Sequence, residues 1–146
     1  MKIILTIALL IGLVTSAQAQ EVKAPANASK KGIASYYHPK FEGRRTATGE
    51  VFKNEKFTAA SNKLRLNTYV KVTNPSNGHV VYVKINDRMA ASNKRMLDLT
   101  QAAADQLGYR KAGTAKVTME VVSDEEGQHG ILAQREIINT SRNNTL

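Results

Sequence analysis

Three carboxylates lie in segments that end a strand or begin a helix. Glu50 directly follows Gly49, Asp87 ends a strongly β-forming segment, and Asp98 comes just before a helical segment. Loops at the ends of barrel strands meet at one mouth, so acids in such positions can gather around one site. Carboxyl groups gathered in this way can donate and accept protons.

Each acid also has a structural interpretation. Glu50 fits a solvated loop acid, and Asp87 next to Arg88 fits a structural ion pair or a turn former. Asp98 lies two residues before Thr100, where it can cap a helix. Taken singly, none of the three acids is specific for catalysis.

The surrounding chain has the pattern of short β-strands with one helical segment. Residues 74–78 contain the Pro and Asn-Gly of a tight turn and predict a hairpin. Thr100 and Gly108 are the expected ends of the helix. The fold class is therefore mainly β with one short helix. The expected strands are 32–37, 68–73, 80–85 and 116–122, and the expected helix is 99–108.

The N-terminal residues have the pattern of a cleavable signal peptide, residues 1–19. Lys2 is followed by the apolar run 3–14 and by Ala17-Gln18-Ala19. The run is shorter than the roughly 20 residues of a membrane-spanning helix. The pattern predicts export to the periplasm or the medium. After it we expect a flexible linker at 20–30, one domain at 31–122 and a polar, disordered tail at 123–146.

Charge and cysteine content narrow the function. The chain has a formal charge of +9, which favours a polyanionic partner such as a cell-wall polymer, although solubility alone also explains it. It lacks an aromatic and basic recognition segment, so no nucleic-acid partner is expected. The absence of cysteine excludes a thiol nucleophile and a lipidated N-terminal cysteine, so we expect neither a lipoprotein nor a stable membrane anchor. Metal-ligand spacing is absent, and we predict no metal and no cofactor.

Read in order, the motifs resemble the rare-lipoprotein-A (RlpA) family over residues 31–122. The segments that carry the resemblance are GxASxY at 32–37, FxGRxTAxGE at 41–50, TAA at 58–60, VxVTN at 70–74, VxINDR at 83–88 and LDLTxAA at 97–103.

The resemblance implies a six-stranded double-psi β-barrel, similar to the barrels of expansins. It implies endolytic cleavage of peptidoglycan between N-acetylmuramic acid and N-acetylglucosamine, on strands without stem peptides, leaving a 1,6-anhydro end. Glu50 and Asp87 match the family's functional acids, and Asp98 matches an acid in the substrate groove of expansin-like barrels. The expected contacts with the glycan are made by Tyr37, Thr46, Ser61 and Arg88.

The proton-handling acid needs a raised pKa near neutral pH, from burial or a neighbouring carboxylate. A guanidinium from Arg88 pointing at Asp87 would oppose that rise. The sequence therefore favours Asp87 for the proton transfer on the condition that Arg88 turns away.

Two positions depart from the family pattern. Ser61 stands where the family has a histidine, and Met89-Ala90 replaces Gly-Pro after the Asn-Asp-Arg motif. Serine does not titrate near neutral pH. This leaves two interpretations: a transglycosylase in which Ser61 orients the substrate, or a non-catalytic, expansin-like wall-binding module. His38, after the first strand, is either a surface residue or a neighbour of the same mouth.

Overall fold

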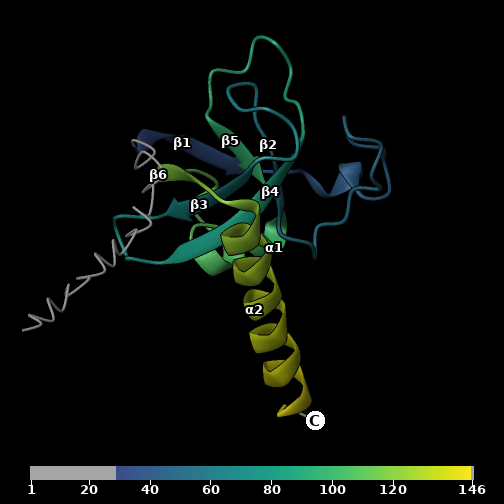
Figure 1. Ribbon diagram of the computed structural model, residues 1–146, viewed down its shortest axis with the longest axis vertical. Coiled ribbons are helices and arrows are strands. Elements are labelled where there is room, and N and C mark those ends of the chain that lie inside the picture. Colours follow the sequence, from purple (N-terminus) through teal and green to yellow (C-terminus); the bar gives the residue numbers. More distant parts are fainter. Residues whose placement is uncertain (1–28, 146) are drawn as a thin grey trace, which may run out of the picture.

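A closed six-stranded β-barrel with two α-helices is formed by residues 29–145, the part of the chain that the computed structural model describes (Figure 1). The expected signal peptide and most of the expected linker lie outside these residues. The elements are β1 (Lys30–Tyr36), the 3₁₀ turn η1 (Pro39–Phe41), β2 (Thr58–Ala60), β3 (Tyr69–Thr73), β4 (Val80–Asp87), β5 (Leu97–Leu99), α1 (Gln101–Leu107), β6 (Ala115–Val122) and α2 (Asp124–Asn143).

The strands follow the order β1-β5-β2-β4-β3-β6 around the barrel. Two neighbouring pairs, β1 with β5 and β2 with β4, are parallel, and the others are antiparallel. The parallel pairing of β1 with β5 sets Ser35 beside Asp98. A mixed sheet closed in this way brings segments distant in sequence to the same mouth.

Alternating burial along the strands builds the core. Along β4, Val81, Val83 and Ile85 are fully buried, whereas Tyr82 and Lys84 between them are partly exposed. Full burial of such a side chain stabilises the fold by about 1.5–3 kcal/mol. The predicted hairpin is also present, because β3 and β4 pair antiparallel from Thr73 and Val80 across the turn.

The predicted α1 ends as expected at Gly108, whose φ of 77° is left-handed. Thr100 occupies the N-cap position, but its hydroxyl donates a hydrogen bond to the Lys56 carbonyl at 2.6 Å instead of capping the helix. The side chain therefore ties the start of α1 to the segment before β2.

The expectations of a disordered tail and of a single helix are wrong, because residues 124–143 form the 20-residue helix α2. Ser123 caps this helix by accepting a hydrogen bond from the Glu126 amide at 3.1 Å. Three acids in the first turn complement the helix dipole. The polar composition of this segment did not predict a helix, because the helix is stabilised by contacts with the barrel that the local sequence does not reveal.

Two glycines let α2 lie directly on tyrosine rings. A Cβ at Gly127 would lie 2.3 Å from Tyr69 Cβ, and one at Gly130 would lie 2.4 Å from Tyr82 Cγ. One turn further, Gln134 accepts a hydrogen bond from the Tyr82 amide at 2.6 Å and donates one to the Tyr82 carbonyl at 3.0 Å. The last turns of α2 project away from the barrel (Figure 1).

No helix within residues 29–145 is both long and apolar enough to cross a membrane.

A methyl group at position 130 is expected to destabilise the domain, although alanine normally favours a helix over glycine by about 1 kcal/mol. The clash with the Tyr82 ring forces α2 off β4 and weakens the Gln134 hydrogen bonds. Gly130→Ala should lower the free energy of unfolding by about 1–3 kcal/mol, measured by urea denaturation. In a Tyr82→Ala background the loss should disappear; a loss of the same size there would contradict this packing.

Candidate active site

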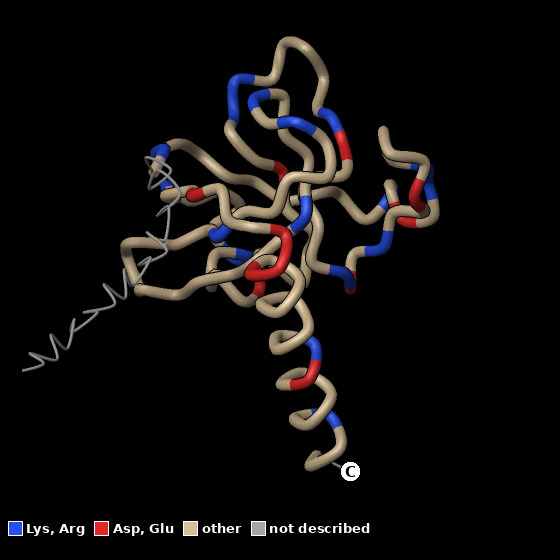
Figure 2. The backbone as a smooth tube through the Cα atoms, in the orientation of Figure 1, with Lys and Arg blue, Asp and Glu red and all other residues tan. Residues whose placement is uncertain are grey.

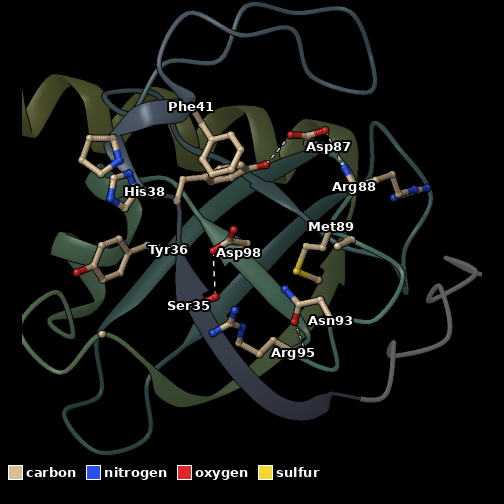
Figure 3. Close-up of a pocket in the computed structure, with 14 residues that line it drawn as sticks. Ser35, Tyr36, His38, Phe41, Asp87, Arg88, Met89, Asn93, Arg95 and Asp98 are labelled. Carbon is tan, nitrogen blue, oxygen red and sulfur yellow. Dashed lines mark hydrogen bonds between the residues drawn. The ribbon is translucent and has the colours of Figure 1, made fainter.

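A groove of about 720 Å³ is lined by residues of β1, β4 and β5 and by the loops that follow β1 and β4 (Figure 3). Its polar side chains include Ser35, Asp87, Arg95 and Asp98. Two of the three predicted acids therefore share one groove.

Asp87 is held by three hydrogen-bond donors from three segments of the chain. The Tyr37 hydroxyl donates to Oδ2 at 2.7 Å, and the amides of Ala47 and Arg88 donate to Oδ1 at 2.9 and 2.8 Å. Burial, followed by the bond to Asp87, raises the pKa of Tyr37 far above its usual value. Tyr37 therefore stays a donor, and the Asp87 oxygens act as acceptors in all three contacts.

The Arg88 side chain turns away from Asp87 (Figure 3). Its Nη1 donates a hydrogen bond to the Ser61 carbonyl at 2.5 Å, and residues 29–145 contain no ion pair between Arg88 and Asp87. The interpretation of Asp87–Arg88 as a structural ion pair therefore does not describe this structure.

Asp98 lies on β5 and is half-buried. Its Oδ1 accepts a hydrogen bond from the Ser35 hydroxyl at 3.0 Å. Burial raises the pKa of Asp98, and the charge of Asp87 adds to the rise, while the Ser35 bond and the charge of Arg95 oppose it. Asp98 does not cap α1, because the first amide of that helix, Gln101, donates to Asn54 Oδ1 at 3.2 Å.

Glu50 lies outside this groove. Its carboxylate accepts hydrogen bonds from Lys84 Nζ at 2.8 Å and Asn86 Nδ2 at 3.0 Å. These two bonds lower the pKa of Glu50. Lys84 is a partly exposed residue of β4 that does not line the groove, and its ammonium group holds the Glu50 carboxylate away from the groove lining.

The loop that contains Glu50 nevertheless reaches Asp87. Within it, the Thr46 amide bonds to the Glu50 carbonyl and the Gly49 amide to the Thr46 carbonyl. This tight turn presents the Ala47 amide to Asp87. The Thr46 side chain is buried and lies 3.0 Å from the Thr48 hydroxyl, so it does not line the groove.

Ser61 has no exposed surface. Its hydroxyl donates to the Met96 carbonyl at 3.1 Å and accepts from the Lys63 amide at 3.2 Å. The expected contact between Ser61 and a substrate is therefore not available to its side chain. The Ser61 carbonyl instead accepts a hydrogen bond from Arg88 Nη1, and the Ser61 amide donates one to the Asp87 carbonyl.

Several groove residues were not among the predicted site residues: Ser35, Phe41 and Arg95. Ser35 lies two residues before Tyr37, so strand alternation was a signal that both face one side. The Phe41 ring packs against the Tyr37 ring at 5.8 Å between centroids. His38 lines the groove, as one interpretation of the sequence suggested, and its Nδ1 accepts the Lys40 amide at 3.1 Å.

Within the described residues, no group of three or more His, Cys, Asp or Glu side chains is placed to hold a metal ion.

The mixed six-stranded barrel, with an acid-lined groove at its mouth, defines a protein of the double-psi β-barrel class. The sequence profile described as lytic transglycolase matches residues 29–119, and the chain belongs to this family. The resemblance to RlpA proteins is thereby confirmed.

Similar proteins include endolytic peptidoglycan transglycosylases RlpA from two bacteria. The Haemophilus influenzae protein is 47% identical over 93 residues, covering 64% of this chain and 32% of the relative. The Pasteurella multocida protein is 40% identical over 114 residues, covering 77% of this chain and 39% of the relative. The chain thus spans about a third of the length of these curated relatives.

Solved structures share the fold. Streptomyces papain inhibitor aligns with a TM-score of 0.55 and 22% identity, covering 68% of this chain and 98% of that protein. The apo expansin of Clavibacter michiganensis aligns with a TM-score of 0.53 and 24% identity, covering 66% of this chain and 51% of the expansin. The predicted double-psi barrel is confirmed, with a second helix added.

Asp98 is expected to make the folded domain less stable as the pH rises. Because its pKa is higher in the folded than in the unfolded chain, the folded state binds more protons, and the free energy of unfolding falls through the interval between the two pKa values. Asp98→Asn removes this dependence. Relative to the wild type, the variant should gain stability in urea denaturation as the pH rises above about 4, the usual pKa of an aspartate.

Ser35→Ala provides the matched comparison, because the Ser35 hydroxyl lowers the pKa of Asp98. Its loss should raise that pKa further and extend the fall in stability to higher pH. A stability difference between wild type and Asp98→Asn that is constant with pH would refute the raised pKa.

Proposed function

We propose that this domain is an endolytic peptidoglycan lytic transglycosylase. It cleaves the bond between N-acetylmuramic acid and N-acetylglucosamine, preferably in strands without stem peptides, and leaves a 1,6-anhydro end. The observation that carries the proposal is the pair of acids in one groove, with Asp98 enclosed and Asp87 held by three donors. Membership of the lytic transglycolase family supports it.

Asp98 handles the proton in this proposal. With its pKa raised, the carboxyl group donates a proton to the leaving glycosidic oxygen as the bond to C1 breaks. The 6-hydroxyl of the muramic acid then bonds to C1 and returns its proton to Asp98. The two proton transfers balance, and no external water is consumed.

Asp87 stabilises the positive charge that develops on the sugar ring. The sequence favoured Asp87 for the proton if Arg88 turned away. Arg88 does turn away, but the three donors on Asp87 suit a fixed acceptor, and the raised pKa favours Asp98 for the proton.

Glu50 acts as a positioning residue. Its contacts with Lys84 and Asn86 anchor the turn that presents the Ala47 amide to Asp87. This role explains how an acid that does not line the groove contributes to it.

An extended glycan is the ligand that the groove is proposed to bind. The Tyr37–Phe41 pair provides an aromatic wall, and aromatic rings pack well against sugar rings. A mutant of the Clavibacter expansin, solved in complex with cellohexaose, shares the fold with a TM-score of 0.52, which supports a chain-like ligand. We also propose export to the periplasm or the medium, because residues 1–19 have the pattern of a signal peptide.

A non-catalytic, expansin-like wall-binding module is the second candidate. The enclosed Ser61, in place of the family's histidine, favours it, because the hydroxyl cannot reach a substrate.

Amide substitutions of the two groove acids separate these candidates. Asp98→Asn should lower the release of 1,6-anhydromuramic acid products from strands without stem peptides by about 10²–10⁴-fold, because the proton donor is lost. Asp87→Asn should also lower it, since the fixed negative charge is lost. Mass spectrometry of the products measures both. A wild-type protein that binds the strands but releases no anhydro product would overturn the enzyme proposal.

Glu50→Gln and Lys84→Met should lower the cleavage rate by a similar factor, about tenfold, because each breaks the same ion pair. The rate is measured with the same strands, together with its pH profile, which should keep its shape in both variants. If Glu50 were the proton donor, Glu50→Gln would be far more damaging than Lys84→Met.

A further inference from the structure

Arg95 is a cation of the groove that the proposed reaction does not use. Its guanidinium makes no hydrogen bond or ion pair with the residues that the structure describes, and its backbone amide donates to Asn93 Oδ1 at 3.0 Å. In Figure 3 the side chain points toward Ser35 and Asp98. The charge of Arg95 acts on Asp98, but the hydrogen-bond donors of its guanidinium are available to a ligand.

The loop between β4 and β5, residues 88–96, carries a net positive charge. It contains Arg88, Lys94 and Arg95 and no acid, and Figure 2 shows basic positions on both of its limbs. Arg88 is bound to the Ser61 carbonyl, and Lys94 lies outside the groove lining. Arg95 is therefore the cation of this loop whose charged group is open to the groove.

The hollow continues past Arg95. A second hollow of about 530 Å³ shares Ala90, Asn93 and Arg95 with the groove and adds Ile33 and Lys94. A chain-like ligand that crosses from one hollow to the other passes the guanidinium. Asn93 adds a donor there, since its Oδ1 is engaged by the Arg95 amide and its Nδ2 has no partner among the described residues.

A guanidinium recognises a carboxylate through two parallel hydrogen bonds. Muramic acid carries a lactyl ether that ends in a carboxylate when no stem peptide is attached, and in an uncharged amide when one is. We propose that Arg95, with Asn93 beside it, binds the free lactyl carboxylate of a muramic acid in the groove. This inference rests on the proposed function and identifies the residue that selects glycans with free carboxylates.

Binding measurements test this role without catalysis. The full chain carrying Asp98→Asn is titrated calorimetrically with a hexasaccharide of alternating N-acetylglucosamine and muramic acid with free carboxylates, and with chitohexaose, which has no lactyl group. Arg95→Gln should weaken binding of the first ligand about tenfold and leave chitohexaose unchanged. Lys71→Gln is the charge-matched control, because it removes a positive charge from β3, outside the lining of both hollows, and it should preserve the difference.

Two further binding measurements, with an amidated ligand and with the variant Arg95→Lys, test whether the carboxylate is what Arg95 recognises. Amidation of the lactyl carboxylates should weaken binding to the Arg95 protein and have no further effect on Arg95→Gln, whereas Arg95→Lys should recover part of the affinity. Because Asp98 is already neutral, an influence of Arg95 on the pKa of Asp98 cannot produce this pattern. Equal losses for both ligands, or no loss for either, would overturn the carboxylate site alone. A protein that binds neither ligand would overturn the proposed function as well.

Discussion

The Asp87 carboxylate is the junction on which the groove depends. It joins the residue after β1, through Tyr37, to the turn around Ala47 and to the end of β4. The backbone of the same residue accepts the Ser61 amide after β2. Three other segments of the chain, at Tyr37, Ala47 and Ser61, thus converge on Asp87. The groove keeps its shape because the acceptors of this residue are matched by donors from those segments.

The three acids differ because their surroundings differ. Asp98 is enclosed with one hydroxyl donor, and burial raises its pKa. Glu50 has an ammonium and an amide within hydrogen-bond distance, which lower its pKa. A fold that holds one acid charged outside the groove and another partly desolvated inside it assigns different roles to residues of the same chemistry.

Local patterns predicted the four longer strands, because alternation and turn residues report on strands directly, but they did not predict the three-residue strands β2 and β5. The closed six-stranded barrel was implied by the family resemblance. The predicted acids Asp87 and Asp98 line the same groove, Asp87 at the end of β4 and Asp98 on β5. Glu50 and Ser61 were harder to place, since the face of a strand end and the enclosure of a small hydroxyl depend on packing by other segments. The tail was mispredicted because Gly127, Gly130 and Gln134 acquire meaning only beside Tyr69 and Tyr82.

The contact between Gln134 and Tyr82 also covers a part of β4 whose backbone has no neighbouring strand on one side, a gap called here the seam of the sheet. β2 pairs with β4 only from Lys84 onward, so the backbone of Tyr82 has no strand beside it there. The Gln134 amide supplies both a donor and an acceptor, as a neighbouring strand would. An uncovered seam is a template for pairing with another chain. Helix α2 thereby guards this barrel against strand-to-strand association with its own copies.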